Sequence, residues 1–320
     1  WAPREIVYLQ YMDNKLLVVG TMAYDAIETP FDKVDKILGG CATYIALSAC
    51  QLQVKIGVVS IVGEDFEEKH LNLLRNKHID LSGVAILKGE KTFFWSGRYH
   101  NDLNTRTTLQ TDLNVLTQFD PKVPEGWSDA SIVLLGNLNP LNQAAVLNQM
   151  TTPPQLVIMD TMNYWMDHFR ADLDELIPRV DVLCINDEEA RQLTDQNSLV
   201  KAAKIIQGMG PKYVIIKKGE HGALLFHQQE VFCAPALPLE EIFDPTGAGD
   251  SFVGGFAAYL SQHGDISFEA MKSAIIFGSA MASFTVEKFG PQNLEILTHE
   301  KIQKRLRTFN QLTKFEIALT

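Results

Sequence analysis

Short apolar runs alternate with amphipathic stretches along most of this chain. The apolar runs that read as buried strands are Lys15–Gly20, Val54–Ser60, Ser131–Gly136, Leu156–Asp160, Val182–Asn186 and Tyr213–Lys217. Helical periodicity occupies the segments between them, at Asp65–Lys77, Pro140–Gln149, Glu188–Thr194 and Leu199–Met209. This alternation predicts βαβ units, and therefore an α/β fold whose mostly parallel sheet carries helices on both faces.

The C-terminal third follows the same pattern with longer helices. A hairpin is expected over Gly222–Cys233, and helices over Gly249–Gln262 and Phe268–Phe284. Ligands of such sheets bind beyond the carboxyl ends of the strands. We therefore expect the strand-end residues Asp160, Asn186 and Lys217 to converge at one cleft.

Two segments interrupt the α/β pattern, at about residues 25–38 and 83–110. In an extended strand, Phe93, Trp95 and Tyr99 project to one face, and Phe94, Ser96 and Arg98 project to the other. We expect the two segments to form a small accessory β-sheet that acts as a lid and excludes water from a reacting site. An oligomer interface or a satellite core explains the same pattern. A small sheet has two faces, so one face can act as the lid while the other forms a dimer contact.

Composition narrows the class of protein. With 46% hydrophobic and 21% charged residues, the chain is long enough to bury one large core, and we expect residues 12–320 to form a single domain. The net charge of −11 argues against nucleic acid and anionic membranes as partners. The four cysteines lack metal-binding spacing, which favours reduced thiols in the cytoplasm. We treat residues 1–11 as an N-terminal extension, either introduced for expression or removed by processing.

The run Asp244–Gly255 carries the strongest chemical signal. Its glycines permit a tight turn, and Asp250 follows at the start of an apolar helical run, where free N–H groups and the helix dipole attract an anion. The run matches neither the P-loop pattern nor the dinucleotide-binding pattern. Such a loop suits transfer of a phosphoryl group to a hydroxyl, with Asp250 taking the proton. The dipole alone predicts an ionised Asp250 at neutral pH, and a simple helix cap is the alternative interpretation.

With these residues in place, the chain resembles the ribokinase-like (PfkB) family of carbohydrate and nucleoside kinases from Leu16 to about residue 306. The resemblance implies a three-layer α/β/α sandwich with a β-sheet lid that often mediates dimerisation, here a homodimer through the lid. It implies Asp250 as catalytic base and the backbone of Gly247, Ala248 and Gly249 as anion hole. Asp244 and Thr246 match positions that contribute to a monovalent-cation site, which makes K⁺ a candidate cofactor.

The resemblance also implies a site for ATP and Mg²⁺. Asn186 and Glu189 match the family's N-x-x-E pair, with Glu189 acting on Mg²⁺ through water; a helix-start carboxylate is the simpler interpretation of Glu189. Lys217, Gly219 and Gly222 match the strand-end turn that lines the nucleotide site, although a solvated lysine is the commoner outcome. Thr246 and Gly249 complete the expected nucleotide contacts, and the adenine pocket is expected within Ala274–Gly290.

On the acceptor side, the resemblance assigns Asp25 to acceptor hydroxyls and Gly39 and Gly40 to close backbone approach. Tyr44 stands where many sugar kinases have Asn, which argues against ribokinase or fructokinase by name. The face of Phe93, Trp95 and Tyr99 is a candidate to cover a sugar ring or to stack on a nucleobase. Arg98 and Arg106 are candidates to bind a phosphorylated acceptor, although exposed lid arginines are more often solvated or paired.

These features predict an ATP-dependent kinase that phosphorylates a hydroxyl of a sugar or sugar-like acceptor. A nucleoside kinase of the same family is the nearer alternative, favoured by Tyr44 and the aromatic lid. A sugar- or nucleotide-binding regulator without catalysis is the more distant alternative, which the intact Asp250 and Glu189 disfavour.

Overall fold

The computed structural model describes residues 14–314. The predicted extension 1–11 and the two ends of the predicted domain lie outside the described residues. The central element is a nine-stranded sheet in the order β13-β12-β11-β10-β9-β8-β1-β4-β5. Its strands are β1 (Lys15–Val19), β4 (Lys55–Gly63), β5 (Ile79–Leu87), β8 (Ile132–Leu135), β9 (Leu156–Met159), β10 (Val182–Asn186), β11 (Tyr213–Lys217), β12 (Ala223–His227) and β13 (Glu230–Ala234). Neighbouring strands from β5 to β11 pair in parallel, while β12 pairs antiparallel to both of its neighbours.

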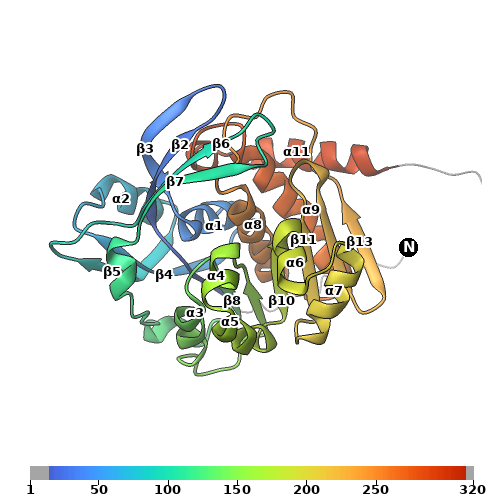
Figure 1. The fold of residues 1–320 in the computed structure, drawn as a ribbon, viewed down its shortest axis with the longest axis horizontal. Coiled ribbons are helices and arrows are strands. Elements are labelled where there is room, and N and C mark those ends of the chain that lie inside the picture. The colour runs from blue at the N-terminus through green and yellow to red at the C-terminus, as the bar shows by residue number, and fades with distance from the viewer. Residues whose placement is uncertain (1–13, 315–320) are drawn as a thin grey trace, which may run out of the picture.

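Helices cover both faces of this sheet, as the alternation of apolar segments predicts (Figure 1). Successive residues of β1 point to opposite faces, so Leu16 and Val18 belong to one apolar core and Leu17 and Val19 to the other. The first core packs α1 (Cys41–Ala49), α2 (Glu68–Asn76), α8 (Ala248–His263), α9 (Phe268–Thr285), α10 (Gln292–Glu295) and α11 (His299–Thr313). The second packs α3 (Pro140–Leu147), α4 (Asn163–His168), α5 (Arg170–Leu176), α6 (Asp187–Thr194) and α7 (Leu199–Gly208). The result is the expected three-layer sandwich.

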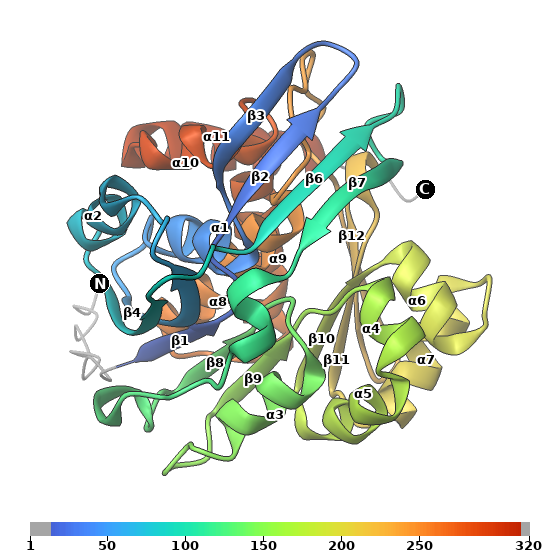
Figure 2. The same ribbon diagram turned by 60° about the vertical axis from the view of Figure 1, so that its left-hand side comes forward.

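A second sheet of four strands stands apart from the sandwich, in the order β3-β2-β6-β7. Its strands are β2 (Ala23–Glu28), β3 (Lys33–Gly39), β6 (Phe94–Tyr99) and β7 (Arg106–Asp112). Figure 2 shows these four strands side by side, projecting beyond the main sheet. We call them the lid, and they confirm that two distant segments form a small accessory sheet.

One predicted boundary of the lid is wrong. The sequence pattern places the second lid segment from residue 83, but residues 79–87 form β5, the edge strand of the main sheet beside β4. An edge strand is half exposed and therefore alternates polar and apolar residues as a lid strand does. The pattern also misses α4 and α5, which lie between β9 and β10.

Candidate active site

Polar side chains gather where the parallel strands β9, β10 and β11 end. Asp160 follows β9, Asn186 ends β10 and Lys217 ends β11, in register with Asn186. Lys217 Nζ lies 3.1 and 3.3 Å from the two carboxylate oxygens of Asp160. The predicted convergence at this edge of the sheet is confirmed. Asp160 has no predicted role beyond this convergence, yet it is the ion-pair partner of Lys217.

The glycine-rich loop leads into the N-terminus of α8, above these strand ends. Gly247 is the N-cap at φ 74°, and Asp250 lies in the first turn. Among residues 14–314, the N–H groups of Gly247, Gly249 and Asp250 have no hydrogen-bond acceptor, whereas the N–H of Ala248 donates to the Pro245 carbonyl oxygen at 3.2 Å. Free N–H groups at the start of a 16-residue helix form an anion-binding site.

Tyr44 fixes the position of this loop. A Cβ built on Gly247 would lie 2.4 Å from the Tyr44 ring, so the ring packs directly against the loop backbone. Tyr44 is 1% exposed, and its hydroxyl has no hydrogen-bond partner in the described part of the chain. Tyr44, which stands where many sugar kinases have Asn, therefore supports the backbone of the predicted anion hole.

The environment of Asp250 differs from that expected from the helix dipole alone. Burial and, to a lesser extent, the neighbouring Asp160 raise the pKa of its carboxyl group to about 7, against the opposing effects of Lys217 and Arg106. The direction is opposite to the one that the dipole predicts, because desolvation disfavours the charged form more than the helix N-terminus stabilises it. A carboxyl group with a pKa near neutrality is well matched to general-base catalysis at neutral pH.

Lys217 supplies fixed positive charge beside the loop. Burial lowers the pKa of its ammonium group, but Asp160, Glu189 and the other negative groups around it together outweigh burial, so the net shift is upward and the side chain stays charged. A Cβ built on Gly249 would lie 3.2 Å from Lys217 Nζ. Lys217 is therefore not a solvated surface lysine: its ammonium group lies beside the loop that carries the free N–H groups.

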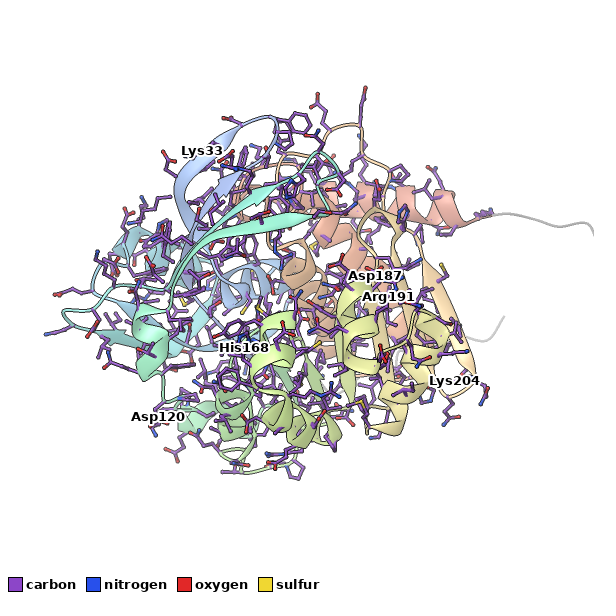
Figure 3. The ribbon with its side chains drawn as sticks, in the orientation of Figure 1. Lys33, Asp120, His168, Asp187, Arg191 and Lys204 are labelled. Atoms are coloured by element: carbon purple, nitrogen blue, oxygen red, sulfur yellow. The ribbon has the colours of Figure 1, made fainter. Side chains whose placement is uncertain are left out.

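Asn186 and Glu189 form a capping box at the start of α6. The Asn186 side chain accepts a hydrogen bond from the Glu189 N–H, and Glu189 Oε2 accepts one from the Asn186 N–H, both at 2.8 Å. Glu189 is 5% exposed, and burial and Asp160 raise its pKa. Figure 3 shows Asp187 and Arg191 of the same helix, which pair with each other. The N-x-x-E pair therefore has a structural role, and Glu189 also lies within electrostatic reach of the strand-end cluster.

Asp25 on β2 is the centre of the predicted acceptor side. It is buried, and a Cβ built on Gly39 would lie 2.0 Å from its Oδ2 atom, so only glycine fits at 39. Gly40 follows at φ 89° and begins α1. Burial, followed by the Asp244 and Asp250 carboxylates, raises the pKa of Asp25 to about 8, and a hydrogen bond from the Gly40 N–H opposes this rise.

Asp244 and Thr246 connect the loop to its surroundings. Asp244 is fully buried and accepts hydrogen bonds from the N–H groups of Thr246 at 2.8 Å and Gly290 at 2.9 Å. The Thr246 hydroxyl lies 3.1 Å from the hydroxyl of Tyr99 on the lid strand β6. The lid is thus bonded directly to the anion-binding loop through Tyr99, whose predicted role is to cover the acceptor together with Phe93 and Trp95.

Two of the lid residues predicted to contact the acceptor have different positions. Trp95 is in register with Asp25, so both side chains lie on the same face of the lid. Arg98 lies three residues further along β6, in register with Glu28, and donates to Glu28 at 2.7 Å, so its guanidinium group already has a partner. The structure brings Trp95, and not Arg98, to the side of Asp25.

Gly219 and Gly222 form the tight turn between β11 and β12. Both have positive φ, 54° and 79°, and the Lys218 N–H donates to the Gly222 carbonyl oxygen at 2.7 Å. A Cβ at Gly222 would lie 2.0 Å from the Ala234 carbonyl oxygen, so this turn tolerates no side chain. The turn directly follows Lys217, as the predicted nucleotide site requires.

Within residues 14–314, no helix is both long and apolar enough to cross a membrane. All four cysteines are free thiols.

Comparisons with known proteins identify the family of this chain. The model of the pfkB family of carbohydrate kinases matches residues 13–297. The chain is 31% identical over 287 residues to a cytidine kinase of Thermococcus kodakarensis, covering 88% of this chain and 99% of that protein. It is 26% identical over 283 residues to a ribokinase of Haemophilus influenzae, covering 82% of this chain and 87% of the relative.

A solved structure of similar fold is that of Burkholderia thailandensis nucleoside kinase in complex with inosine. It superimposes with a TM-score of 0.74 at 22% identity and covers 92% of this chain and 97% of that one. The family match extends over most of the chain and includes the loop, the strand-end cluster and the lid. The protein is therefore an ATP-dependent kinase that belongs to the pfkB family of carbohydrate kinases.

Proposed function

We propose that this protein transfers the γ-phosphoryl group of ATP to a hydroxyl group of a ribose-containing acceptor, in the first place a nucleoside. The observation that carries the proposal is the position of Asp250, in the first turn of α8 between a loop of free N–H groups and the acceptor-side carboxylate Asp25. The cytidine kinase relative favours a nucleoside.

Asp25 and the Gly39–Gly40 backbone hold the acceptor. A carboxylate accepts two hydrogen bonds at once, which suits the vicinal hydroxyls of a ribose. Tyr44 stands where many sugar kinases have Asn, and its ring packs against Gly247. The Trp95 side chain lies on the same face of the lid as Asp25. An aromatic ring there covers the apolar side of a sugar or stacks on a base.

Asp250 takes the proton of the acceptor hydroxyl. The acceptor oxygen forms its bond to the γ-phosphorus while the bond to the β–γ bridging oxygen breaks, so that ADP leaves and the proton remains on Asp250. The free N–H groups of Gly247, Gly249 and Asp250 and the Lys217 ammonium stabilise the negative charge on the transferring group, whereas the N–H of Ala248 is held by the Pro245 carbonyl oxygen. Gly219, Gly222 and Thr246 line the nucleotide side, with the adenine expected near Ala274–Gly290.

The site fits a magnesium ion held mainly by phosphates and water. No group of three or more His, Cys, Asp or Glu residues within 14–314 has the geometry of a metal site. Mg²⁺ in phosphoryl-transfer enzymes takes one or two carboxylates plus phosphates and water, and Glu189 offers the carboxylate oxygen that the capping box leaves free. When bound, Mg²⁺ neutralises phosphate charge. We also propose that a monovalent cation, K⁺, binds near Asp244 and Thr246.

A free sugar is the second candidate acceptor, because the ribokinase relative matches most of the chain and Asp25 suits a sugar diol as well as a nucleoside. Assembly as a homodimer through the outer face of the lid and a cytoplasmic location also remain proposals. The free cysteines support the location, since reducing compartments keep thiols unpaired.

The test is ADP release from Mg·ATP over a panel of nucleosides, sugars and sugar phosphates. Asp250→Asn should retain ATP binding and lower kcat at least about 10²-fold, the contribution of a general base. Asp172→Asn, which removes an acidic residue from the first turn of α5, is the matched control and should be neutral. Near-normal turnover of Asp250→Asn would refute the assignment of the base. A best acceptor without a nucleobase would refute the nucleoside in favour of the free sugar.

A further inference from the structure

The last helix, α11, forms one wall of a cavity of about 300 Å³. Its lining residues on α11 are Lys301, Lys304, Arg305 and Thr308, which have the i, i+3, i+4, i+7 spacing of a single helix face. The opposite wall consists of the last turn of α9, the residues that follow it and the start of α10. Three of the four residues from α11 are basic, so the cavity is a local basic region in a chain whose net charge is −11.

Arg305 is bound to the protein itself. Its Nη1 atom donates to the Ser283 hydroxyl at 2.8 Å, and its Nη2 atom donates to the two carboxylate oxygens of Glu287 at 2.9 and 3.1 Å. Its guanidinium carbon lies 3.9 Å from the centre of the Phe284 ring. The positive charge of Arg305 and the negative charge of Glu287 therefore compensate each other.

The ammonium groups of Lys301 and Lys304 have no such partners. Within residues 14–314, neither Nζ atom takes part in a hydrogen bond, an ion pair or an aromatic contact, and both side chains are exposed. Like charges at neighbouring positions of one helix face repel each other. Because Arg305 is balanced by Glu287, the two lysines leave two positive charges uncompensated in the cavity.

Asn293 adds a hydrogen-bond acceptor to the same cavity. The residue is 8% exposed, and its amide nitrogen donates to the Phe284 carbonyl oxygen at 2.8 Å and to Glu287 at 3.1 Å. Its side-chain oxygen accepts no hydrogen bond from residues 14–314. That oxygen is therefore left for an external donor, such as water or a hydroxyl group of a ligand.

The cavity is separate from the proposed phosphoryl-transfer site. Within the described residues, its lining includes no residue of the lid, of the anion-binding loop or of the strand-end cluster. The backbone between α9 and α10 connects the two regions, because the Asp244 N–H donates to the Val286 carbonyl oxygen at 3.4 Å and the Gly290 N–H donates to Asp244 at 2.9 Å. A ligand in the cavity therefore contacts a segment that is bonded to the start of the loop.

We propose that this cavity binds the phosphate group of a small phosphorylated metabolite. A phosphate monoester carries a charge of about −1.5 to −2 at pH 7, which matches the two uncompensated ammonium groups. Sites for small molecules begin at a volume of about 300 Å³, so the cavity has room for a pentose beside the phosphate, and the hydroxyl groups of a pentose suit the free oxygen of Asn293. The inference does not depend on the proposed kinase reaction and adds a second site for phosphorylated ligands.

The test measures the acetylation rate of each lysine of the full chain by mass spectrometry, with and without ribose 5-phosphate. At ten times its Kd the ligand leaves about one-tenth of the sites free, so acetylation of Lys301 and Lys304 should slow about 10-fold. Lys201 and Lys204 are the matched pair, since they have the same spacing on the exposed face of α7, which packs on the other apolar core (Figure 3). Their acetylation should be unchanged, and ribose without a phosphate group should protect neither pair.

Single variants identify the contacts. In Lys301→Gln, protection of Lys304 should require at least about 10-fold more ribose 5-phosphate, because one charge-assisted hydrogen bond is lost, and Lys304→Gln should have the same effect on the protection of Lys301. Lys201→Gln removes the same charge elsewhere and should leave the concentration dependence unchanged. All three substitutions lie outside the proposed phosphoryl-transfer site and replace exposed side chains, so kcat and the thermal unfolding midpoint should keep their wild-type values.

Four outcomes would overturn the proposal. Unchanged acetylation of Lys301 and Lys304 would remove the site, and equal protection of Lys201 and Lys204 would show unspecific binding of anions. Equally strong protection by inorganic phosphate would replace the phosphorylated metabolite by free phosphate, and protection by Mg·ADP alone would assign the cavity to the nucleotide. A protein that phosphorylates no acceptor would refute the proposed function and leave this measurement valid, because protection requires no turnover.

Discussion

The contact between Gly247 and Tyr44 predicts that a single methyl group at the loop is strongly destabilising. Gly247 has φ 74°, and Gly89 has nearly the same φ of 76°. Alanine in that region costs about 1 kcal/mol in backbone strain alone. A Cβ at Gly89 meets nothing within 4 Å, whereas a Cβ at Gly247 lies 2.4 Å from the Tyr44 ring. Gly89→Ala is therefore a control with the same backbone strain and no steric contact.

We expect Gly89→Ala to lower the free energy of unfolding by about 1 kcal/mol. Gly247→Ala should add about 1–3 kcal/mol for overpacking against a buried ring, or about 2–4 kcal/mol in total. The added methyl group also displaces the N–H groups of the loop, so kcat should fall in Gly247→Ala and stay unchanged in Gly89→Ala. Denaturant titration at constant m-value measures the first effect, and ADP release measures the second.

The double variant Gly247→Ala with Tyr44→Leu tests the cause. Leucine removes the ring, so the steric part of the cost should disappear and the double-mutant cycle should give a coupling of at least about 1 kcal/mol. Equal destabilisation by Gly247→Ala and Gly89→Ala would refute the role of Tyr44 as the support of the loop.

Two further predictions concern charge. Because the pKa is raised to about 7 for Asp250 and to about 8 for Asp25, kcat/KM should fall as the pH drops through this range and the carboxylates gain protons, which a pH–rate profile from pH 5 to 9 measures. Both groups bind protons more tightly in the folded protein than in the unfolded chain, so the unliganded protein should lose stability as the pH rises from about 4 to 8; a constant stability in denaturant titrations would contradict the shifts. Lys217→Met should raise the KM for ATP and move the acid limb of the profile to higher pH, because it removes a charge that lowers the pKa of Asp250. Lys212→Met, at the other end of β11 and paired with Asp181 at 2.9 Å, should change neither, and an equal effect of both variants would argue for a general loss of charge.

The central strands were predictable from the sequence because a strand that is buried on both faces consists of consecutive apolar residues. The strands β1, β8, β9, β10 and β11 occur within one residue of their predicted bounds. The edge strand β5 was not separable from the lid, since its residues are half exposed in both situations. Short local patterns carry no information on which sheet an exposed strand joins, because that choice depends on distant partners.

The same distinction between local and long-range features applies to the site. The loop from Gly247 to Asp250 and the Asn186–Glu189 pair are local in sequence and could be found there. The support of the loop by Tyr44 and the pairing of Lys217 with Asp160 join segments that are far apart. The ionisation of Asp250 shows the same limit: the helix dipole is a local property, whereas burial is a property of the folded protein.

The lid is assembled from segments that are far apart in the chain. Glu28 on β2 and Arg98 on β6 are neighbours in the lid but lie 70 residues apart in the chain. The elements β4, α2 and β5 lie between them and belong to the sandwich, so pairing of β2 with β6 closes a long loop. Contacts of such long separation slow folding. We therefore expect the lid strands to pair later and to open more readily than the strands that lie between the two apolar cores.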